Sequence, residues 1–132
     1  MKGLVIGCWD LFHYGHAHMI EQCLTMCKCL TIGVISDDII RERKKHEPAV
    51  FERYRYMLLD ILYPHCDVIL FNGKPDKSFY NQFDVIFVSS ALRGKKFYFI
   101  PDDYKGNVVY ILYTEGISSS SIRHNLIFGM VL

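Results

Sequence analysis

The sequence has 132 residues, enough for one compact domain but not for two. Hydrophobic residues make up 51% of the chain and charged residues 22%, a composition that predicts a packed core and excludes intrinsic disorder. The charges of the 15 basic and 14 acidic side chains nearly cancel. The chain therefore has no excess positive charge of the kind that binds nucleic acid or an anionic membrane surface. No apolar run reaches the roughly 20 residues of a membrane-spanning helix. We therefore expect residues 1–132 to form a single domain that binds no nucleic acid and spans no membrane.

Cysteine spacing fits no disulfide framework, and the five positions are Cys8, Cys23, Cys27, Cys29 and Cys66. Free thiols in a reducing cytoplasm are the expectation. The alternative is a zinc site formed by Cys23, Cys27 and Cys29, with His18 nearby. However, Cys23 and Cys27 share one face of an expected helix, where buried cysteines act as small core residues. We therefore expect no protein-bound metal.

Strand-like and helix-like segments alternate along the chain. Short apolar runs predict buried strands over residues 3–8, 30–35, 67–71, 84–88 and 107–112. Helical spacing predicts helices over residues 16–27, over residues 51–62 with Met57, Leu58, Leu59 and Leu62 on one apolar face, and over residues 119–128. The charged segment 36–47 is expected to be a polar loop that could close over a substrate. The alternation predicts an α/β fold, a single three-layer, Rossmann-like domain with a five-stranded parallel sheet.

A first motif joins the first strand to the first helix, where an α/β sheet presents its ligand site. Residues 7–16 read GCWDLFHYGH, and Gly7 and Gly15 permit tight turns or close approach of a ligand. The helix N-terminus near Gly15 offers unpaired N–H groups to a phosphate. His13 and His16 can face the same anion, and a turn or helix cap is the less favoured alternative for Asp10. We predict a phosphate site here.

A second motif follows the last strand. Residues 114–123 read TEGISSSSIR, in which Gly116 supplies backbone freedom. The serine hydroxyls can cap a helix or donate to phosphate oxygens. Arg123, about one turn into the helix, could reach the same anion with its planar guanidinium. Taken alone, helix capping explains this segment equally well.

The two motifs together resemble the HxGH and ISSTxIR signatures of the nucleotidyltransferase superfamily, in the form found in cytidylyltransferases. This resemblance implies transfer of CMP from CTP to a phosphorylated alcohol such as glycerol 3-phosphate, with release of pyrophosphate. It also implies Mg²⁺ bound with the triphosphate, and a homodimer. The alternatives are an adenylyltransferase acting on a mononucleotide such as FMN, and a member that binds nucleotide with weakened catalysis.

The resemblance also implies a role for individual residues. Catalytic roles are implied for His13, His16, Lys44 and Arg123. Nucleotide binding is implied for Gly7, Cys8, Trp9, Asp10, Gly15, Thr114, Gly116, Ile117, Ser118, Ser119 and Ser120. Acceptor binding is implied for Arg55, preferred to Arg53, and for Lys44, with Lys45 as the alternative lysine.

Three positions depart from the family pattern. Tyr113 replaces the usual arginine before the second motif, residues 89–92 (SSAL) replace a glycine and acidic residues, and Cys8 replaces a threonine or similar residue. The first two changes concern the pockets for the base and the acceptor, whereas the phosphate machinery is intact. Altered specificity or weakened catalysis is therefore kept as an alternative.

Overall fold

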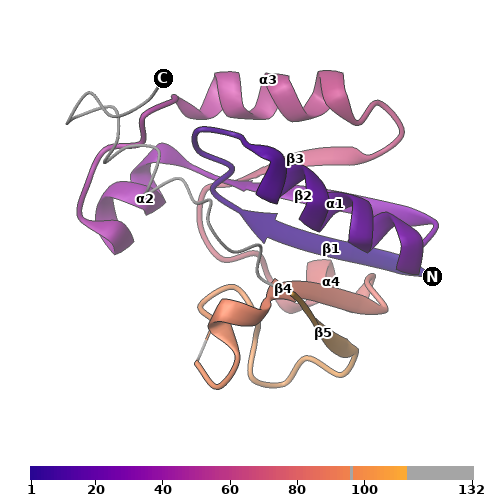
Figure 1. Cartoon of the computed structure of the whole chain (residues 1–132). Coiled ribbons are helices and arrows are strands. Elements are labelled where there is room, and N and C mark those ends of the chain that lie inside the picture. Colours follow the sequence, from indigo (N-terminus) through magenta and orange to yellow (C-terminus); the bar gives the residue numbers. More distant parts are fainter. Residues whose placement is uncertain (96, 113–132) are drawn as a thin grey trace.

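A parallel five-stranded sheet forms the centre of the protein in this computed structural model, which describes residues 1–95 and 97–112 (Figure 1). The strands are β1 (Lys2–Gly7), β2 (Cys29–Ile35), β3 (Asp67–Phe71), β4 (Val85–Ser89) and β5 (Asn107–Ile111). They lie in the order β3-β2-β1-β4-β5, and every neighbouring pair is parallel. The predicted α/β fold with a five-stranded parallel sheet is confirmed.

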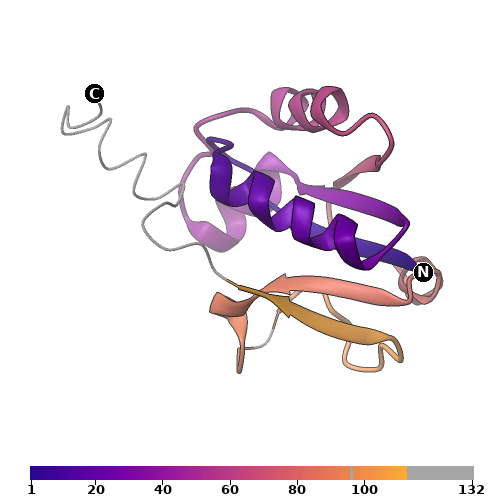
Figure 2. The same cartoon turned by 45° about the vertical axis from the view of Figure 1, so that its right-hand side comes forward.

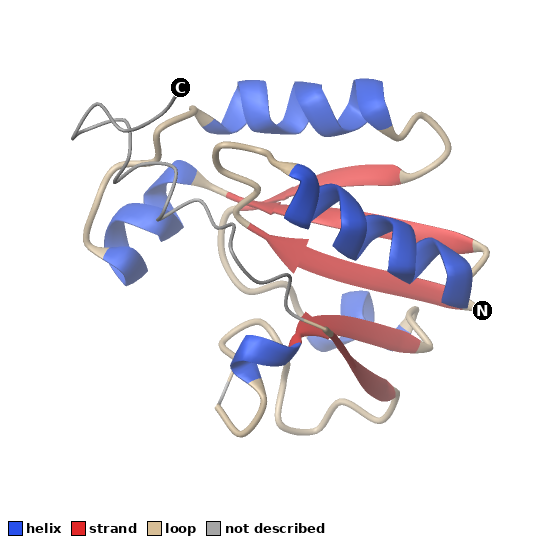
Figure 3. Ribbon diagram, viewed as in Figure 1, coloured by secondary structure: helices blue, strands red, loops and turns tan. Residues whose placement is uncertain are grey.

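Helices cover both faces of the sheet, as expected for strands that read as nearly continuous apolar runs. The helices are α1 (Tyr14–Met26), α2 (Asp37–Lys44), α3 (Glu52–Leu62) and α4 (Lys77–Asn81). Helices α1 and α3 lie over one face, and α4 lies behind β4 on the other (Figures 1 and 2). A short 3₁₀ turn, Ser90–Leu92, follows β4 directly (Figure 3). None of the helices in residues 1–95 and 97–112 is long and apolar enough to cross a membrane.

Two buried clusters form the core, one on each side of the sheet. Along β1, successive side chains point to opposite faces. Val5 packs with Ile20 and Leu59 from α1 and α3, whereas Ile6 packs with Ile40 of α2 and Tyr80 of α4. The first cluster also contains Cys23 and Cys27, which are core residues as their helical spacing predicted.

The charged segment after β2 forms a helix, so its prediction as a loop was wrong. The Ser36 hydroxyl accepts a hydrogen bond from the Ile39 amide and caps the N-terminus of α2. Acidic side chains occupy the first turn and basic ones the last turn, which suits the helix dipole. Ile40 anchors the helix in the core, and Lys45 ends it in a left-handed conformation with φ of 61°.

Helix α3 also differs from its prediction, because it buries a different face. Met57, Leu58 and Leu62 are 52, 41 and 48% exposed, and of the predicted apolar face only Leu59 is buried. The other buried side chain of α3 is Arg55. Its hydrogen bonds to the Cys8, Ile35 and Val50 carbonyls turn this face of α3 toward the sheet. The predicted helix over residues 119–128 lies outside the described residues.

Candidate active site

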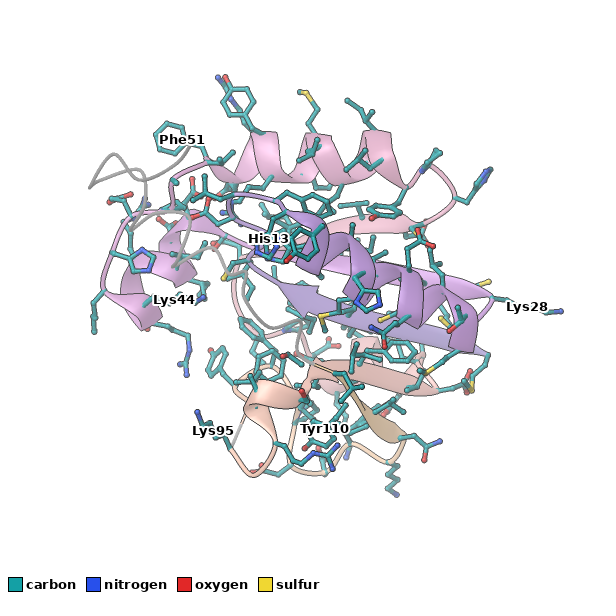
Figure 4. All side chains as sticks on the ribbon, viewed as in Figure 1. His13, Lys28, Lys44, Phe51, Lys95 and Tyr110 are labelled. Carbon is teal, nitrogen blue, oxygen red and sulfur yellow. The ribbon has the colours of Figure 1, made fainter. Side chains whose placement is uncertain are left out.

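A cavity of about 340 Å³ opens at the carboxyl ends of β1, β2 and β4. This is the topological switch point, since the chain connects β1 to β2 on one side while β4 pairs on the other. Its lining includes Gly7, Cys8, Trp9, Asp10, His16 and Lys44 from the predicted set. Figure 4 shows His13 and Lys44 at this end of the sheet and Lys28 at the opposite end. The structure therefore brings the first motif and the lysine after it to one site.

Trp9 anchors the loop between β1 and α1. Its backbone φ is 56° and that of Leu11 is 50°, a left-handed conformation that bulky residues rarely adopt. The buried indole Nε1–H donates to the Gly33 carbonyl of β2 at 2.9 Å. A Cβ at Gly7 would lie 2.9 Å from the indole Cε2, so this glycine makes room for the ring. Local strain held by such an anchor is typical of a functional loop.

His13 and His16 form a reciprocal cap at the N-terminus of α1. The Nδ1 of His13 accepts the Gly15 amide at 3.1 Å, and the Nδ1 of His16 accepts the His13 amide at 3.3 Å. An Nδ1 that accepts cannot carry the proton of a neutral ring. Each imidazole is therefore in the tautomer with its proton on Nε2, and each presents one N–H donor beyond the cap.

Burial favours the neutral form of both imidazoles. It lowers the pKa of His13, and it lowers the pKa of His16 to about 4, with the charges on His13 and Lys44 adding to the shift and Asp10 opposing it. The two rings stack with centroids 3.8 Å apart. The Nε2 of His13 is buried and has no hydrogen-bond partner among the described residues. A buried donor without a partner is costly, and an anion at this helix terminus would supply the partner.

Lys44 and His46 bring basic side chains to the cavity from the end of α2. Both line the cavity, and the charge of Lys44 acts on His16. Of the two lysines considered from the sequence, Lys45 is not among the lining residues and instead ends α2. His46 was missed, because one histidine in a charged run gives no signal that separates a site residue from a solvated one.

Asp10 ties the first motif to the chain segment that precedes α3. One carboxylate oxygen accepts the Ala49 amide at 2.8 Å, and the other accepts the Val50 amide at 2.9 Å. The carboxylate is buried and lines the cavity. Asp10 therefore holds the segment after Pro48 beside the loop between β1 and α1.

Arg55 lies behind the cavity rather than in it. Its Nη1 donates to the carbonyl oxygens of Cys8 and Ile35 at 2.6 and 2.7 Å, and its Nη2 pairs with the Asp37 carboxylate at 2.7 Å. Its Nε donates to the Val50 carbonyl at 2.8 Å, and the side chain is 1% exposed. This placement does not support the predicted binding of an acceptor phosphate, because protein atoms already surround the guanidinium.

The second motif lies outside the described residues, together with the departure at Tyr113. The structure therefore places none of the predicted residues Thr114, Gly116, Ile117, Ser118, Ser119, Ser120 and Arg123. Within residues 1–95 and 97–112, no group of three or more histidine, cysteine or acidic side chains is arranged to hold a metal ion.

Comparison with known proteins identifies the family of this site. A family model described as cytidylyltransferase-like matches residues 4–62, which include the whole first motif. The chain is 28% identical over 130 residues to the glycerol-3-phosphate cytidylyltransferase of Staphylococcus aureus, covering 93% of this chain and 92% of the relative. The chain is cytidylyltransferase-like over residues 4–62. It is a distant homologue of the glycerol-3-phosphate cytidylyltransferases over nearly its full length.

A second relative is similar to this chain over nearly its full length, and a solved structure has the same fold. The glycerol-3-phosphate cytidylyltransferase of Bacillus subtilis is 26% identical over 132 residues, covering 95% of this chain and 96% of the relative. A solved structure of a lipopolysaccharide core biosynthesis protein from Thermoplasma volcanium superimposes with a TM-score of 0.66. It is 18% identical and covers 86% of this chain and 96% of that chain, so it supports the Rossmann-like fold alone. The histidines that cap α1 thus lie in the part of the chain that matches the cytidylyltransferase-like family model.

Proposed function

We propose that this cytidylyltransferase-like protein transfers CMP from CTP to the phosphate of a phosphorylated small alcohol. The observation that supports it most directly is the pair His13 and His16, two neutral imidazoles whose Nε2–H donors have no role in the cap itself. Such donors suit the non-bridging oxygens of an α-phosphate, where negative charge builds during transfer. Lys44, on the same cavity, adds a positive charge.

The proposed reaction is a direct displacement. A phosphate oxygen of the acceptor attacks the α-phosphorus of CTP and forms a new P–O bond. The bond between the α-phosphorus and the bridging oxygen to the β-phosphate breaks, and its electron pair leaves with pyrophosphate. The products are a CDP-alcohol and pyrophosphate, and no protein nucleophile takes part. The protein supplies positioning and charge stabilisation.

CTP is proposed to enter as its magnesium complex. Since no metal-binding cluster of protein side chains is present among the described residues, the triphosphate oxygens and water would be the main ligands of Mg²⁺. The N-terminus of α1 would face the phosphates. Binding of the β- and γ-phosphates by Ser119, Ser120 and Arg123 stays a prediction from the sequence motif.

Two histidines on the same helix make a matched test of this function. Pyrophosphate release is measured with magnesium and CTP or ATP over a panel of phosphate monoesters and FMN. His16→Ala should lower kcat by at least about 100-fold, the usual cost of one lost charge-stabilising donor. His18→Ala, an exposed position one half-turn further along α1, should keep the full rate. Equal rates for the two variants would refute the role of His16, and a preference for ATP would refute cytidylyl transfer.

We further propose that a second copy of the chain covers the outer face of α3. Apolar side chains recur there at helical spacing and are 41–68% exposed: Tyr54, Met57, Leu58, Ile61 and Leu62. Phe51, at the start of the helix, also points away from the sheet (Figure 4). A regular exposed apolar stripe is typical of an interface, and two identical stripes can pair about a twofold axis.

A further inference from the structure

We infer that Tyr98 is a positioning residue, whose ring holds the last turn of α2 through Arg43 and so keeps Lys44 at the cavity. The part of Lys44 in the reaction rests on the proposed function, whereas the placement of α2 does not. Tyr98 lies in the segment between β4 and β5, and neither sequence motif includes it.

Packing by itself does not fix the position of Lys44. The side chain is exposed although it lines the cavity, and the other charged residues of the same turn are exposed as well. Ile40 is the one buried side chain of α2, and it lies about one turn before Lys44. An exposed lysine has many rotamers, so its place depends on what holds the backbone beneath it.

The chain on either side of this turn is held by hydrogen bonds. At the start of α2, the Asp37 amide donates to the Glu52 carboxylate and the Glu52 amide donates to the Asp37 carboxylate, each at 3.0 Å. Beyond the helix, the Asp10 carboxylate accepts the amides of Ala49 and Val50. The last turn of α2 lies between these two fixed points.

An aromatic contact reaches this turn from the segment after β4. The Arg43 guanidinium carbon lies over the Tyr98 ring, 4.0 Å from the ring centroid. A cation in this place is attracted by the negative face of the ring. Successive side chains of a helix are turned by about 100° from each other. Arg43 can therefore meet Tyr98 while Lys44, the next residue, faces the cavity.

Tyr98 is itself held by the core. Its ring meets the ring of Phe99 edge to face, with the centroids 4.9 Å apart. Phe99 is 2% exposed and packs against Phe71 at the end of β3. Phe97, on the other side of Tyr98 in the chain, lines the cavity. The Tyr98 ring is therefore the anchored partner, and the exposed turn of α2 is the part that it positions.

Lys74 supplies a matched control because it meets the same ring from a different segment. Its Nζ lies 5.6 Å from the Tyr98 centroid, and the residue belongs to the loop between β3 and α4. Loss of Lys74 removes a positive charge beside the same ring without changing α2. Tyr98→Phe is a second control, because a phenylalanine ring keeps the face that attracts a cation.

Amide hydrogen exchange of the full chain tests the contact without turnover. In Tyr98→Leu and in Arg43→Met, the amides of residues 43–45 should exchange at least about twofold faster, the effect of losing one exposed cation–π contact. Arginine and methionine have similar helix propensities, so Arg43→Met leaves the helix itself intact. Lys74→Met and Tyr98→Phe should exchange at the parent rate. A smaller change in Arg43→Met, or an equal change in Lys74→Met, overturns the proposal.

A double-mutant cycle with Lys44 tests the consequence for the reaction. With CTP and the acceptor most active with the parent protein, Arg43→Met should lower kcat for pyrophosphate release by at least about twofold, and Lys74→Met should keep the parent rate. In the Lys44→Ala background, Arg43→Met should have no further effect, because the group that the contact positions is gone. An equal loss in both backgrounds would mean that the contact only stabilises the fold, and it overturns the proposal. A parent protein without turnover would refute the proposed function, and the exchange rates would then decide the role of Tyr98 by themselves.

Discussion

Replacing Arg55 by methionine separates two roles that this side chain could have. Methionine keeps most of the volume and the apolar stem but removes the guanidinium. In the structure, the guanidinium joins four parts of the site end of the sheet through Cys8, Ile35, Asp37 and Val50. If this is its role, the substitution lowers the stability of the fold and affects acceptor binding only indirectly.

The expected size of the effect follows from what the substitution leaves behind. The ion pair with Asp37 is nearly buried, with side-chain exposures of 1 and 14%. Removing one partner of such a pair costs about 3 kcal/mol, because the remaining charge loses its compensation. The carbonyl oxygens of Cys8, Ile35 and Val50 lose a donor in addition. We therefore expect the free energy of unfolding to fall by about 3 kcal/mol or more.

Urea denaturation followed by circular dichroism measures this loss. With a slope of about 1.5 kcal/mol per molar urea, the midpoint should fall by about 2 M. Arg53→Met is the matched control on the same helix, because Arg53 is exposed and its guanidinium contacts only the neighbouring Tyr54 by hydrogen bond and ring stacking among the described residues. The control should stay within about 0.5 kcal/mol of the parent protein.

The opposite result would support the role that the sequence suggested. A midpoint within error of the parent, together with a KM for the acceptor raised tenfold or more and an unchanged KM for CTP, would mean that Arg55 binds the acceptor phosphate. In that case the hydrogen bonds of Arg55 in the structure would not describe the state that binds substrate.

Three further predictions concern His16, Trp9 and the outer face of α3. Because the folded-state pKa of His16 is about 4, below its ordinary value of 6.5, its neutral form stabilises the fold fully above pH 6.5, and this contribution is lost as the pH falls toward 4. Urea unfolding should therefore show a stability loss of up to about 2 kcal/mol between pH 7 and pH 5 that is absent in His16→Gln; an equal loss in both proteins would contradict the shift. Trp9→Phe removes the buried bond to Gly33 and should cost about 1–2 kcal/mol in the same assay, and no change would mean that the indole N–H does not anchor the loop. Ile61→Lys, at a position 68% exposed, should turn a dimer into a folded monomer in sedimentation velocity, and a parent protein that is already monomeric at micromolar concentration would rule the interface out.

The strands and the position of the two histidines at the start of α1 were predictable because their signals are local. Each strand is a short apolar run, and the alternation of Val5 and Ile6 between the two core clusters follows from the pleat. His13 and His16 lie within one turn of the helix that they cap, so their spacing alone brings both rings to one helix terminus. The predicted family rested on these residues together with the second motif, residues 114–123.

Segments whose state depends on a few buried contacts were predicted less well. Helix α2 was predicted as a loop because its charged residues outnumber its apolar ones. Ile40 is its one buried side chain and sets which face of the helix packs against the core. In α3 the apolar positions Met57, Leu58 and Leu62 outnumber the buried ones, yet Arg55 and Leu59 face the sheet. Periodicity identifies a helix but cannot show which of two faces meets the core when both could.

The amino-acid sequence by itself determined the five strands in chain order, the parallel sheet and the position of His13 and His16 at the start of the first helix. Only the tertiary structure decided which groups Asp10 and Arg55 bind and which side chains surround the first motif. Arg55 meets the Cys8 carbonyl from 47 residues away, and Asp10 meets Val50 from 40 residues away. Leu92 and Phe97 reach the same cavity from beyond β4. Contacts between distant segments depend on how the elements pack, and short-range patterns of residue type carry no record of that packing.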